Sequence, residues 1–191
     1  MSWKEYFKMA SLQRESHANA VKRILDASIS AANPADAVRR WLTRDGNLLR
    51  VNGREYPLNE FSGVYLVSVG KAAISMAVAA SELLGGNPHE GIVVAKYLPA
   101  VSLPENLAFL ESSHPLPNER SLRAGEMILA LLKKTTASDL VIFLISGGGS
   151  ALMTSPVTGV SLKDMEKLTS LLLACAARID EINTLCRALD R

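Results

Sequence analysis

Residues 139–152 read DLVIFLISGGGSAL, and this stretch decides the fold class. It begins with an apolar run of the length and composition of a strand that is buried on both faces, which is typical of a parallel sheet. The run leads directly into three consecutive glycines between two serines. The sequence therefore predicts a glycine loop at the carboxyl end of a buried strand, where open parallel sheets bind their ligands.

Other strands and helices alternate around this stretch. The alternation predicts a three-layer, Rossmann-like α/β fold, in which a mostly parallel sheet has helices on both faces. We expect the fold to be incomplete at the C-terminus, because the chain stops inside a predicted helix. The other predicted strands are residues 64–69, 91–95 and 107–111. The predicted helices are residues 72–84, 119–134, 162–177 and 181–191, with Asn118, Ser161 and Asp180 as N-caps of the last three.

The first 60 residues are predicted to be a helical and hairpin lead-in to a core formed by residues 61–191. A helical pattern covers residues 5–31, and Asn33 is expected to cap a short helix that ends near Trp41. Asn52-Gly53 predicts the turn of a peripheral β-hairpin. The whole chain, residues 1–191, is thus interpreted as one partial domain.

Composition restricts the kinds of partner. The chain has 191 residues, 48% of them apolar, and a net charge of +2, so we expect one globular domain that does not bind nucleic acid. No apolar segment approaches the roughly 20 residues needed to span a membrane, and the N-terminus lacks a signal peptide, which indicates a cytoplasmic protein. Cys175 and Cys186 do not form a disulfide framework, and each is expected to be a small buried residue.

The glycine loop is the strongest candidate for a binding site. Consecutive glycines lose much backbone entropy on folding, which is explained if backbone N–H groups must approach a ligand closely. The flanking serines add hydroxyl donors, so the loop predicts a phosphate or carboxylate cradle. The alternative is a tight turn whose glycines serve only the backbone conformation. The candidate binding residues are Ser146, Gly147, Gly148, Gly149 and Ser150.

Two further motifs follow predicted strands. Lys71, in Gly70-Lys71, begins a predicted helix, where its charge opposes the helix dipole by roughly 0.3–1 kcal/mol unless an anion binds there. His114, in Ser113-His114-Pro115, could bind an anion or hydroxyl, or act as an acid or base. The alternatives are an exposed lysine and a structural histidine. No cluster of His, Asp or Glu has the spacing of metal ligands, so no metal-ligating residue is predicted.

Four segments, taken together, resemble a known family. In order and spacing, residues 69–72, 113–115, 145–152 and 181–184 are similar to the N-terminal domain of the class II (MOFRL-type) glycerate kinases, once named hydroxypyruvate reductases. The resemblance implies ATP- and Mg²⁺-dependent phosphorylation of D-glycerate, usually at the 2-hydroxyl, in a cleft between two α/β domains. It also implies that Lys71 contacts the substrate or the transferring phosphate, that residues 146–150 cradle phosphate, and that His114 and Asn183 line the cleft.

The sequence also departs from that family. Cys186 stands where the family usually has a basic residue, and the second domain is absent. The resemblance therefore predicts an N-terminal fragment that has weak anion affinity at most and no useful turnover by itself. We expect it to associate with itself or to need the missing domain, because truncation leaves apolar surface uncovered.

Two other functions remain open. A phosphosugar isomerase-type binding domain would also use a parallel sheet and a Ser/Gly loop, although the triple glycine and Ser113-His114-Pro115 argue against it. An NAD(P)H-dependent hydroxypyruvate reductase would need a Gly-x-Gly-x-x-Gly segment after its first strand. Val69-Gly70-Lys71-Ala72 contains only one glycine.

Overall fold

The central element of the fold is a four-stranded sheet in which all strands are parallel. The computed structural model describes residues 18–85, 88–98 and 102–191. Its strand order is β6-β5-β4-β7, so the predicted α/β class is confirmed. The strands are β4 (Val64–Val69), β5 (Glu90–Ala95), β6 (Leu107–Glu111) and β7 (Leu140–Ile145).

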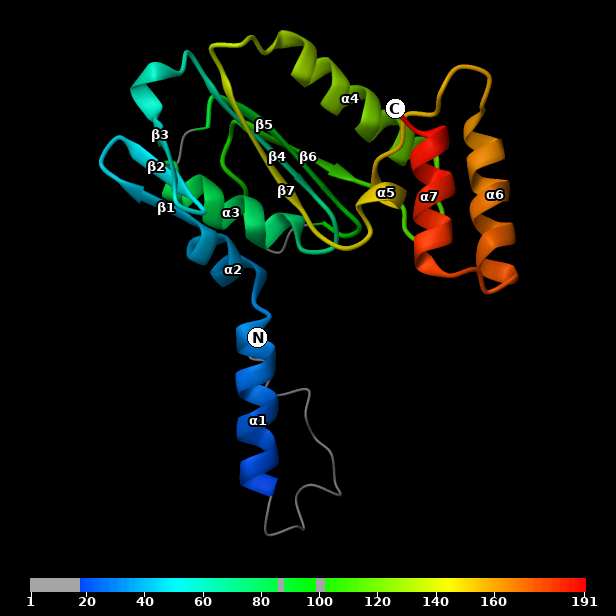
Figure 1. The fold of residues 1–191 in the computed structure, drawn as a ribbon, viewed down its shortest axis with the longest axis horizontal. Coiled ribbons are helices and arrows are strands. Elements are labelled where there is room, and N and C mark those ends of the chain that lie inside the picture. The colour runs from blue at the N-terminus through cyan, green and yellow to red at the C-terminus, as the bar shows by residue number, and fades with distance from the viewer. Residues whose placement is uncertain (1–17, 86–87, 99–101) are drawn as a thin grey trace.

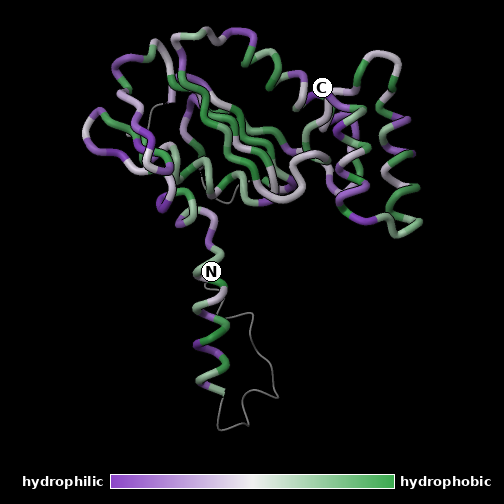
Figure 2. Tube along the Cα trace, in the orientation of Figure 1, coloured by the Kyte–Doolittle hydropathy of each residue, from purple (hydrophilic) through white to green (hydrophobic). Residues whose placement is uncertain are grey.

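Helices cover both faces of this sheet, as predicted (Figure 1). Helix α3 (Ala73–Leu83) lies on one face, where small residues such as Ala77 and Ala80 are fully buried against Leu66 and Val93. Helix α4 (Glu119–Lys134) lies on the other face and packs on a second apolar cluster. The strands form the most continuously hydrophobic part of the chain trace (Figure 2), because both of their faces are covered.

The strand order creates a switch point between β4 and β7. The chain passes from β4 to β5 on one side, whereas α4 carries it from β6 past β5 and β4 to β7 on the other side. Loops that leave β4 and β7 therefore diverge above the same crevice. Open parallel sheets bind ligands at such a crevice, on the carboxyl side of the strands.

The N-terminal part forms a separate small sheet. Helix α1 (Ala18–Ala31) extends away from the body (Figure 1), and α2 (Pro34–Trp41) begins after the Asn33 cap, as predicted. Asn52 and Gly53 both have positive φ, at 47° and 77°, as a hairpin turn requires. The prediction missed one strand, since the sheet contains three: β1 (Leu42–Asp45), β2 (Leu48–Val51) and β3 (Arg54–Pro57). The part of the predicted first helix before residue 18 lies outside the described residues.

The C-terminal part is a helical hairpin that stands beyond the carboxyl ends of the strands (Figure 1). Helix α6 (Leu162–Ala174) ends earlier than predicted because Ala176 adopts a left-handed conformation, with φ of 54°. Helix α7 (Ile179–Leu189) starts after Arg178, so the prediction of Asp180 as its N-cap was wrong. A short helix, α5 (Gly149–Leu152), follows the glycine loop and was not predicted.

Both cysteines belong to this hairpin, and the expectation that they are buried was wrong. Cys175 is exposed and Cys186 is half-buried. The helical pattern was right, but it did not show that the hairpin stands outside the sheet core, where few side chains are covered. No helix in the described part of the chain is long and apolar enough to cross a membrane.

Candidate functional site

The glycine loop after β7 presents backbone N–H groups that are not used within the structure. Gly148 has φ of +90°, which few residues other than glycine adopt. Within the described residues, the N–H groups of residues 147–150 have no hydrogen-bond acceptor, although the next three N–H groups, at 151–153, donate to Gly148 and Gly149 carbonyls. Four successive unpaired donors at a strand end are the arrangement that an anion cradle requires.

Ser146 connects this loop to the loop after β4. Its N–H donates to the Val69 carbonyl at 2.9 Å, and its Oγ accepts from the Ala72 N–H at 3.0 Å. The Lys71 N–H donates to the Gly147 carbonyl at 3.0 Å. The Ser146 hydroxyl therefore holds two strand ends together, whereas Ser150 is exposed and lines a groove beside the loop.

Gly70 makes this connection possible. Its φ is +127°, and a Cβ at this position would lie 2.1 Å from Ser146 Oγ and 2.6 Å from the Ser146 carbonyl oxygen. Only a residue without a side chain permits the two loops to approach so closely. As a result, Lys71, the next residue, is fixed beside the glycine loop.

Lys71 and His114 both lie against Gly148. A Cβ on Gly148 would lie 2.8 Å from His114 Cδ2, 3.1 Å from His114 Nε2 and 3.5 Å from Lys71 Cε. The structure thus brings together three motifs that are far apart in the sequence. His114 is half-buried, whereas Lys71 is exposed. An anion on the loop would therefore contact the imidazole and a solvent-exposed ammonium group.

The electrostatic environment of these residues is positive. Burial, followed by the charges of Lys71 and Lys96, lowers the pKa of His114, which is therefore neutral at neutral pH. Neither lysine forms an ion pair with any described residue, so both charges are available to a ligand. An anion would be attracted by both lysine charges and would favour the charged form of the imidazole.

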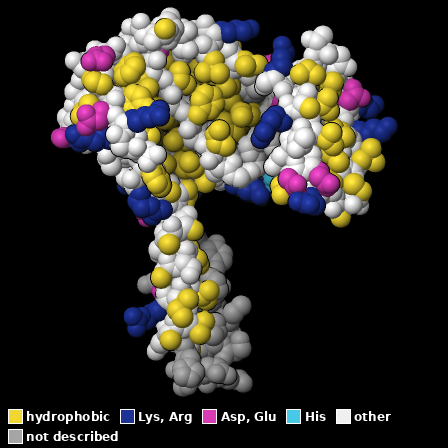
Figure 3. Space-filling model, viewed as in Figure 1, with side chains coloured by type: hydrophobic (Ala, Val, Ile, Leu, Met, Phe, Trp, Pro, Cys, Tyr) yellow, Lys and Arg dark blue, Asp and Glu magenta, His cyan; other side chains and the backbone are white. Residues whose placement is uncertain are grey.

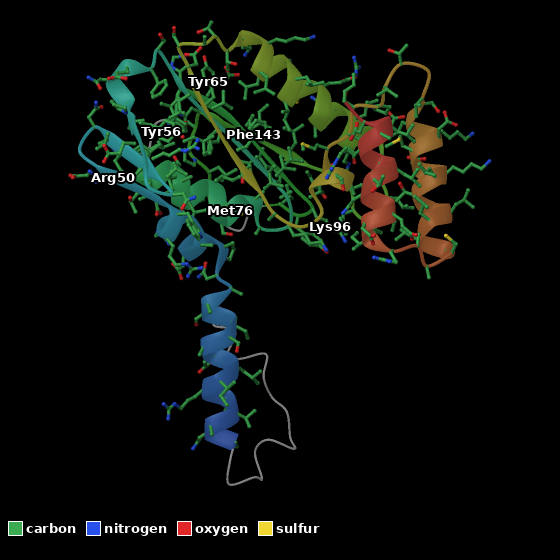
Figure 4. The ribbon with its side chains drawn as sticks, in the orientation of Figure 1. Arg50, Tyr56, Tyr65, Met76, Lys96 and Phe143 are labelled. Atoms are coloured by element: carbon green, nitrogen blue, oxygen red, sulfur yellow. The ribbon has the colours of Figure 1, made fainter. Side chains whose placement is uncertain are left out.

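Lys96 was missed from the sequence. It directly follows β5, and its position near the carboxyl ends of the strands is visible in Figure 4. Its Nζ lies 5.2 Å from the centre of the Tyr97 ring. Its place directly after a buried strand was the signal that could have identified it, since the same reasoning selected Lys71.

A groove of about 430 Å³ separates the glycine loop from the α6–α7 hairpin. Asn183, on α7, lines this groove together with Gly147, Gly148 and His114. The groove thus brings Asn183 and the glycine loop to the same cavity. Its other lining residues are Pro115, Pro117, Ser150, Ala151, Met165, Thr169, Leu173, Ile179, Ile182 and Cys186.

The donor set around the loop suits an anion and does not suit Mg²⁺. Magnesium prefers carboxylate and other oxygen ligands, whereas the groups near Gly148 are backbone N–H groups, an imidazole and lysines. In residues 18–85, 88–98 and 102–191, no group of three or more His, Cys, Asp or Glu side chains could hold a metal ion. The groups that meet at Gly148 therefore do not by themselves form a magnesium site.

Several known proteins are similar to this chain over most of its length. A relative from Thermotoga maritima, D-glycerate 2-kinase, is 38% identical over 88% of this chain, and rat glycerate kinase is 37% identical over 91%. A third relative, from Agrobacterium vitis, is 36% identical and carries the provisional name hydroxypyruvate reductase. The chain spans only 35–37% of the length of these three relatives. The resemblance to glycerate kinases that the four motifs indicated is confirmed.

Two solved structures share the fold. A protein from Pyrococcus horikoshii superposes with a TM-score of 0.77 at 35% identity, and the glycerate kinase of Thermotoga maritima with a TM-score of 0.70 at 38% identity. Each match covers 88% of this chain and 37% of the other. The family described as a domain of unknown function, DUF4147, matches residues 20–191. The chain therefore belongs to the DUF4147 family.

Proposed function

We propose that this chain carries the phosphate-binding part of a kinase that phosphorylates D-glycerate with ATP, as its relatives are named to do. The observation that carries the proposal is the row of unpaired N–H groups at residues 147–150, beside Lys71 and His114. In this proposal residues 61–191 form the core of a partial N-terminal domain in a cytoplasmic enzyme. A second domain supplies the rest of the cleft.

Phosphoryl transfer depends mainly on positioning and on neutralising the charge of the transferring group. The loop N–H groups are fixed by the backbone and would hold phosphate oxygens without further reorganisation. The Lys71 ammonium group would approach the same oxygens from the adjacent strand end. We therefore assign the phosphate cradle to residues 147–150, the positioning of this loop to Ser146, and the contact with the transferring phosphate to Lys71.

His114 and Asn183 suit the recognition of glycerate. Neutral His114 presents one nitrogen donor and one acceptor, which fit a hydroxyl or a carboxylate oxygen. Asn183 lines the same groove as His114, and its amide offers both kinds of group. ATP would supply the phosphoryl group, and Mg²⁺ would neutralise the charge of its phosphates.

The test is an NMR titration of the ¹⁵N-labelled chain with 2-phosphoglycerate, ATP and glycerate. The amide signals of residues 147–150 should shift with either phosphate compound, and the signals of Asn183 and His114 should shift with glycerate. A coupled glycerate kinase assay on the chain alone should show no useful turnover. If the loop amides do not respond to any phosphate compound, the proposal is wrong.

The hydroxypyruvate reductase alternative is addressed by the same titration with NADH. A dinucleotide site needs open backbone at the first strand–helix turn, but Ser146 fills the space against Gly70 at the end of β4. We expect no NADH-dependent shift near Gly70. Hexose 6-phosphates in a parallel titration test the phosphosugar isomerase alternative. Binding of these compounds more tightly than 2-phosphoglycerate would favour it.

A further inference from the structure

A second groove lies between α2 and α3, on the side of the sheet that α3 covers. The two helices lie side by side (Figures 1 and 4), and the groove between them has a volume of about 350 Å³. Figure 3 shows hydrophobic side chains on the body close to the point where α1 leaves it, which is the side on which α2 lies. The residues that line this α2–α3 groove are Ala35, Arg39, Lys71, Ala72, Ile74, Ser75, Val78 and Ala79.

One end of the α2–α3 groove is joined to the glycine loop. The Lys71 N–H donates to the Gly147 carbonyl at 3.0 Å, and the Ala72 N–H donates to Ser146 Oγ at 3.0 Å. Lys71 Cε also lies 3.5 Å from the position that a Cβ on Gly148 would take. The groove therefore begins where the proposed phosphate cradle ends, because Lys71 belongs to both.

Arg39 lines the groove with its charge already compensated. Its guanidinium group donates to Glu82 Oε2 at 2.8 Å and to Asp36 Oδ1 at 3.3 Å. The bond to Glu82 joins α2 to α3, so it holds the guanidinium group between the two helices. A guanidinium group in this position can stack on an aromatic ring. It is a poor site for a further phosphate, because two carboxylates already balance its charge.

The lining indicates which part of a ligand would fit. Glycerate carries an oxygen on each of its three carbons, so an apolar groove contributes little to binding it. The base of a nucleotide has flat apolar faces and is joined to its phosphates through a ribose. Ligand pockets of about 300–1,000 Å³ are typically lined by apolar side chains and a few polar groups, as this groove is. From Ala72 to Ala79 the chain rises by about 10 Å, which provides length for a base and a ribose.

We propose that the α2–α3 groove binds the adenosine part of ATP. The base packs on Ile74 and Val78 and stacks on the Arg39 guanidinium group, and the triphosphate extends past Lys71 to the glycine loop. Ser75 Oγ donates to the Ala72 carbonyl at 3.0 Å and can still accept a hydrogen bond from a ribose hydroxyl. This proposal rests on the proposed function, since it takes the phosphates to lie on the loop, and it leaves the groove beside α7 for glycerate.

The test is an NMR titration of the full chain, labelled with ¹⁵N and with ¹³C in its methyl groups, using ATP, tripolyphosphate and adenosine. ATP should shift the loop amide signals and the methyl signals of Ile74 and Val78, and adenine protons should show nuclear Overhauser effects to these methyl groups. Tripolyphosphate should shift the loop amide signals alone.

The titration separates this proposal from the proposed function. If ATP shifts the loop amide signals but not the methyl signals of Ile74 and Val78, the adenosine site is wrong and the phosphate cradle stands. If adenosine shifts the methyl signals while no phosphate compound shifts the loop, the adenosine site is supported and the phosphate cradle is wrong.

A variant that fills the groove makes the test specific. Val78→Phe should weaken ATP binding by about tenfold in calorimetry and leave tripolyphosphate binding unchanged. The matched control is Leu129→Phe, because Leu129 is half-buried on α4, on the other face of the sheet. Circular dichroism confirms that each variant is folded. Unchanged ATP affinity in Val78→Phe, or an equal loss of tripolyphosphate affinity, would overturn the proposal.

Arg39→Gln provides a second variant at an exposed position, where the fold should be kept. Loss of the stacked guanidinium group should weaken ATP binding by about threefold, again without an effect on tripolyphosphate. Arg40→Gln is its control, since Arg40 is the next residue of α2, is also exposed and does not line the groove. An equal loss of ATP affinity in the two variants would show an effect of overall charge and would contradict stacking on Arg39.

Discussion

The two strand ends that meet at the switch point use glycine in opposite ways. At the end of β4, Gly70 is packed against Ser146, and no space remains above it. At the end of β7, Gly147 has no atom within 4 Å of the position where its Cβ would be, and the surrounding N–H groups are unpaired. One glycine brings two loops together, whereas the other leaves the backbone open.

This difference shows how the site is built. The closed strand end fixes Lys71 by locking its backbone to Gly147, and the open strand end offers donors to a ligand. The two strand ends should therefore differ in what a substitution changes. Substitutions at the β4 end should act mainly on folding, and substitutions near the β7 end mainly on anion affinity.

The largest expected effect is on stability, from Gly70→Ala. The methyl group would overlap the Ser146 backbone, and alanine at φ of +127° is strained. The free energy of unfolding should fall by roughly 2–5 kcal/mol, as expected for overpacking combined with backbone strain. Urea unfolding followed by circular dichroism measures the change.

Gly147→Ala is the matched control for that measurement. Its φ is not positive and its Cβ would meet no other atom, so stability should change by no more than about 0.5 kcal/mol. Equal losses of stability in the two variants would contradict the proposed contrast between the two strand ends, because both glycines would then be needed for packing.

The second effect is on binding, from Lys71→Met. Hydrogen bonds to charged groups contribute roughly 1.5–3 kcal/mol, so the affinity for phosphate should fall by about tenfold or more. Stability should hardly change, because the Lys71 side chain is exposed and unpaired within the described residues. Isothermal titration calorimetry gives the affinity.

Lys133→Met serves as its control. Lys133 is an exposed lysine in the last turn of α4, and it precedes the amino end of β7, whereas the glycine loop follows the carboxyl end. It should bind phosphate as the unchanged chain does. A similar loss in both variants would mean that phosphate responds only to overall charge. Retention of affinity in Lys71→Arg would support a direct role for the cation.

The elements of the fold were predictable because their signals are local. An apolar run identifies β7, and side-chain caps mark the starts of α2, α4 and α6. The failures arose where tertiary context decides the outcome. Strand β1 directly follows α2 without a turn residue, and α7 starts at a cap formed by the Arg178 backbone and the Glu181 carboxylate.

The candidate site was predictable only in part. The motifs of Lys71, His114 and the glycine loop could each be selected as a strand end, but sequence alone left each with a structural alternative. Their proximity at Gly148 depends on the strand order, which places β7 next to β4 although β5 and β6 lie between them in the sequence. Lys96 also directly follows a predicted strand, but its place near His114 likewise depends on this strand order.

The third effect is a pH dependence of anion binding through His114. Its pKa is lowered in the folded chain, so this group contributes stability that is present above the unfolded value of about 6.5 and is lost as the pH falls. A bound anion stabilises the charged imidazole and should raise this pKa. Sulfate, which does not titrate in this range, should therefore bind more tightly at lower pH. If sulfate raises the pKa of His114 by about half a unit, its affinity should increase by roughly threefold.

NMR signals of the His114 ring report the pKa with and without sulfate. His114→Gln should keep the fold and bind sulfate with no pH dependence of this origin. An unchanged His114 pKa at saturating sulfate would show that the imidazole does not face the anion. The anion would then be held by the N–H groups of the open strand end and by Lys71 alone.

The smallest expected effect comes from Lys96→Met. This variant tests whether the end of β5 also contacts the anion. Lys96 lowers the pKa of His114 less than Lys71 does, so its removal should raise that pKa slightly. Phosphate affinity should fall by only about threefold, as for a charge that acts through solvent. If the loss instead equals that of Lys71→Met, the end of β5 touches the anion directly. The cradle would then consist of three strand ends, and the contrast between the closed β4 end and the open β7 end would describe only part of it.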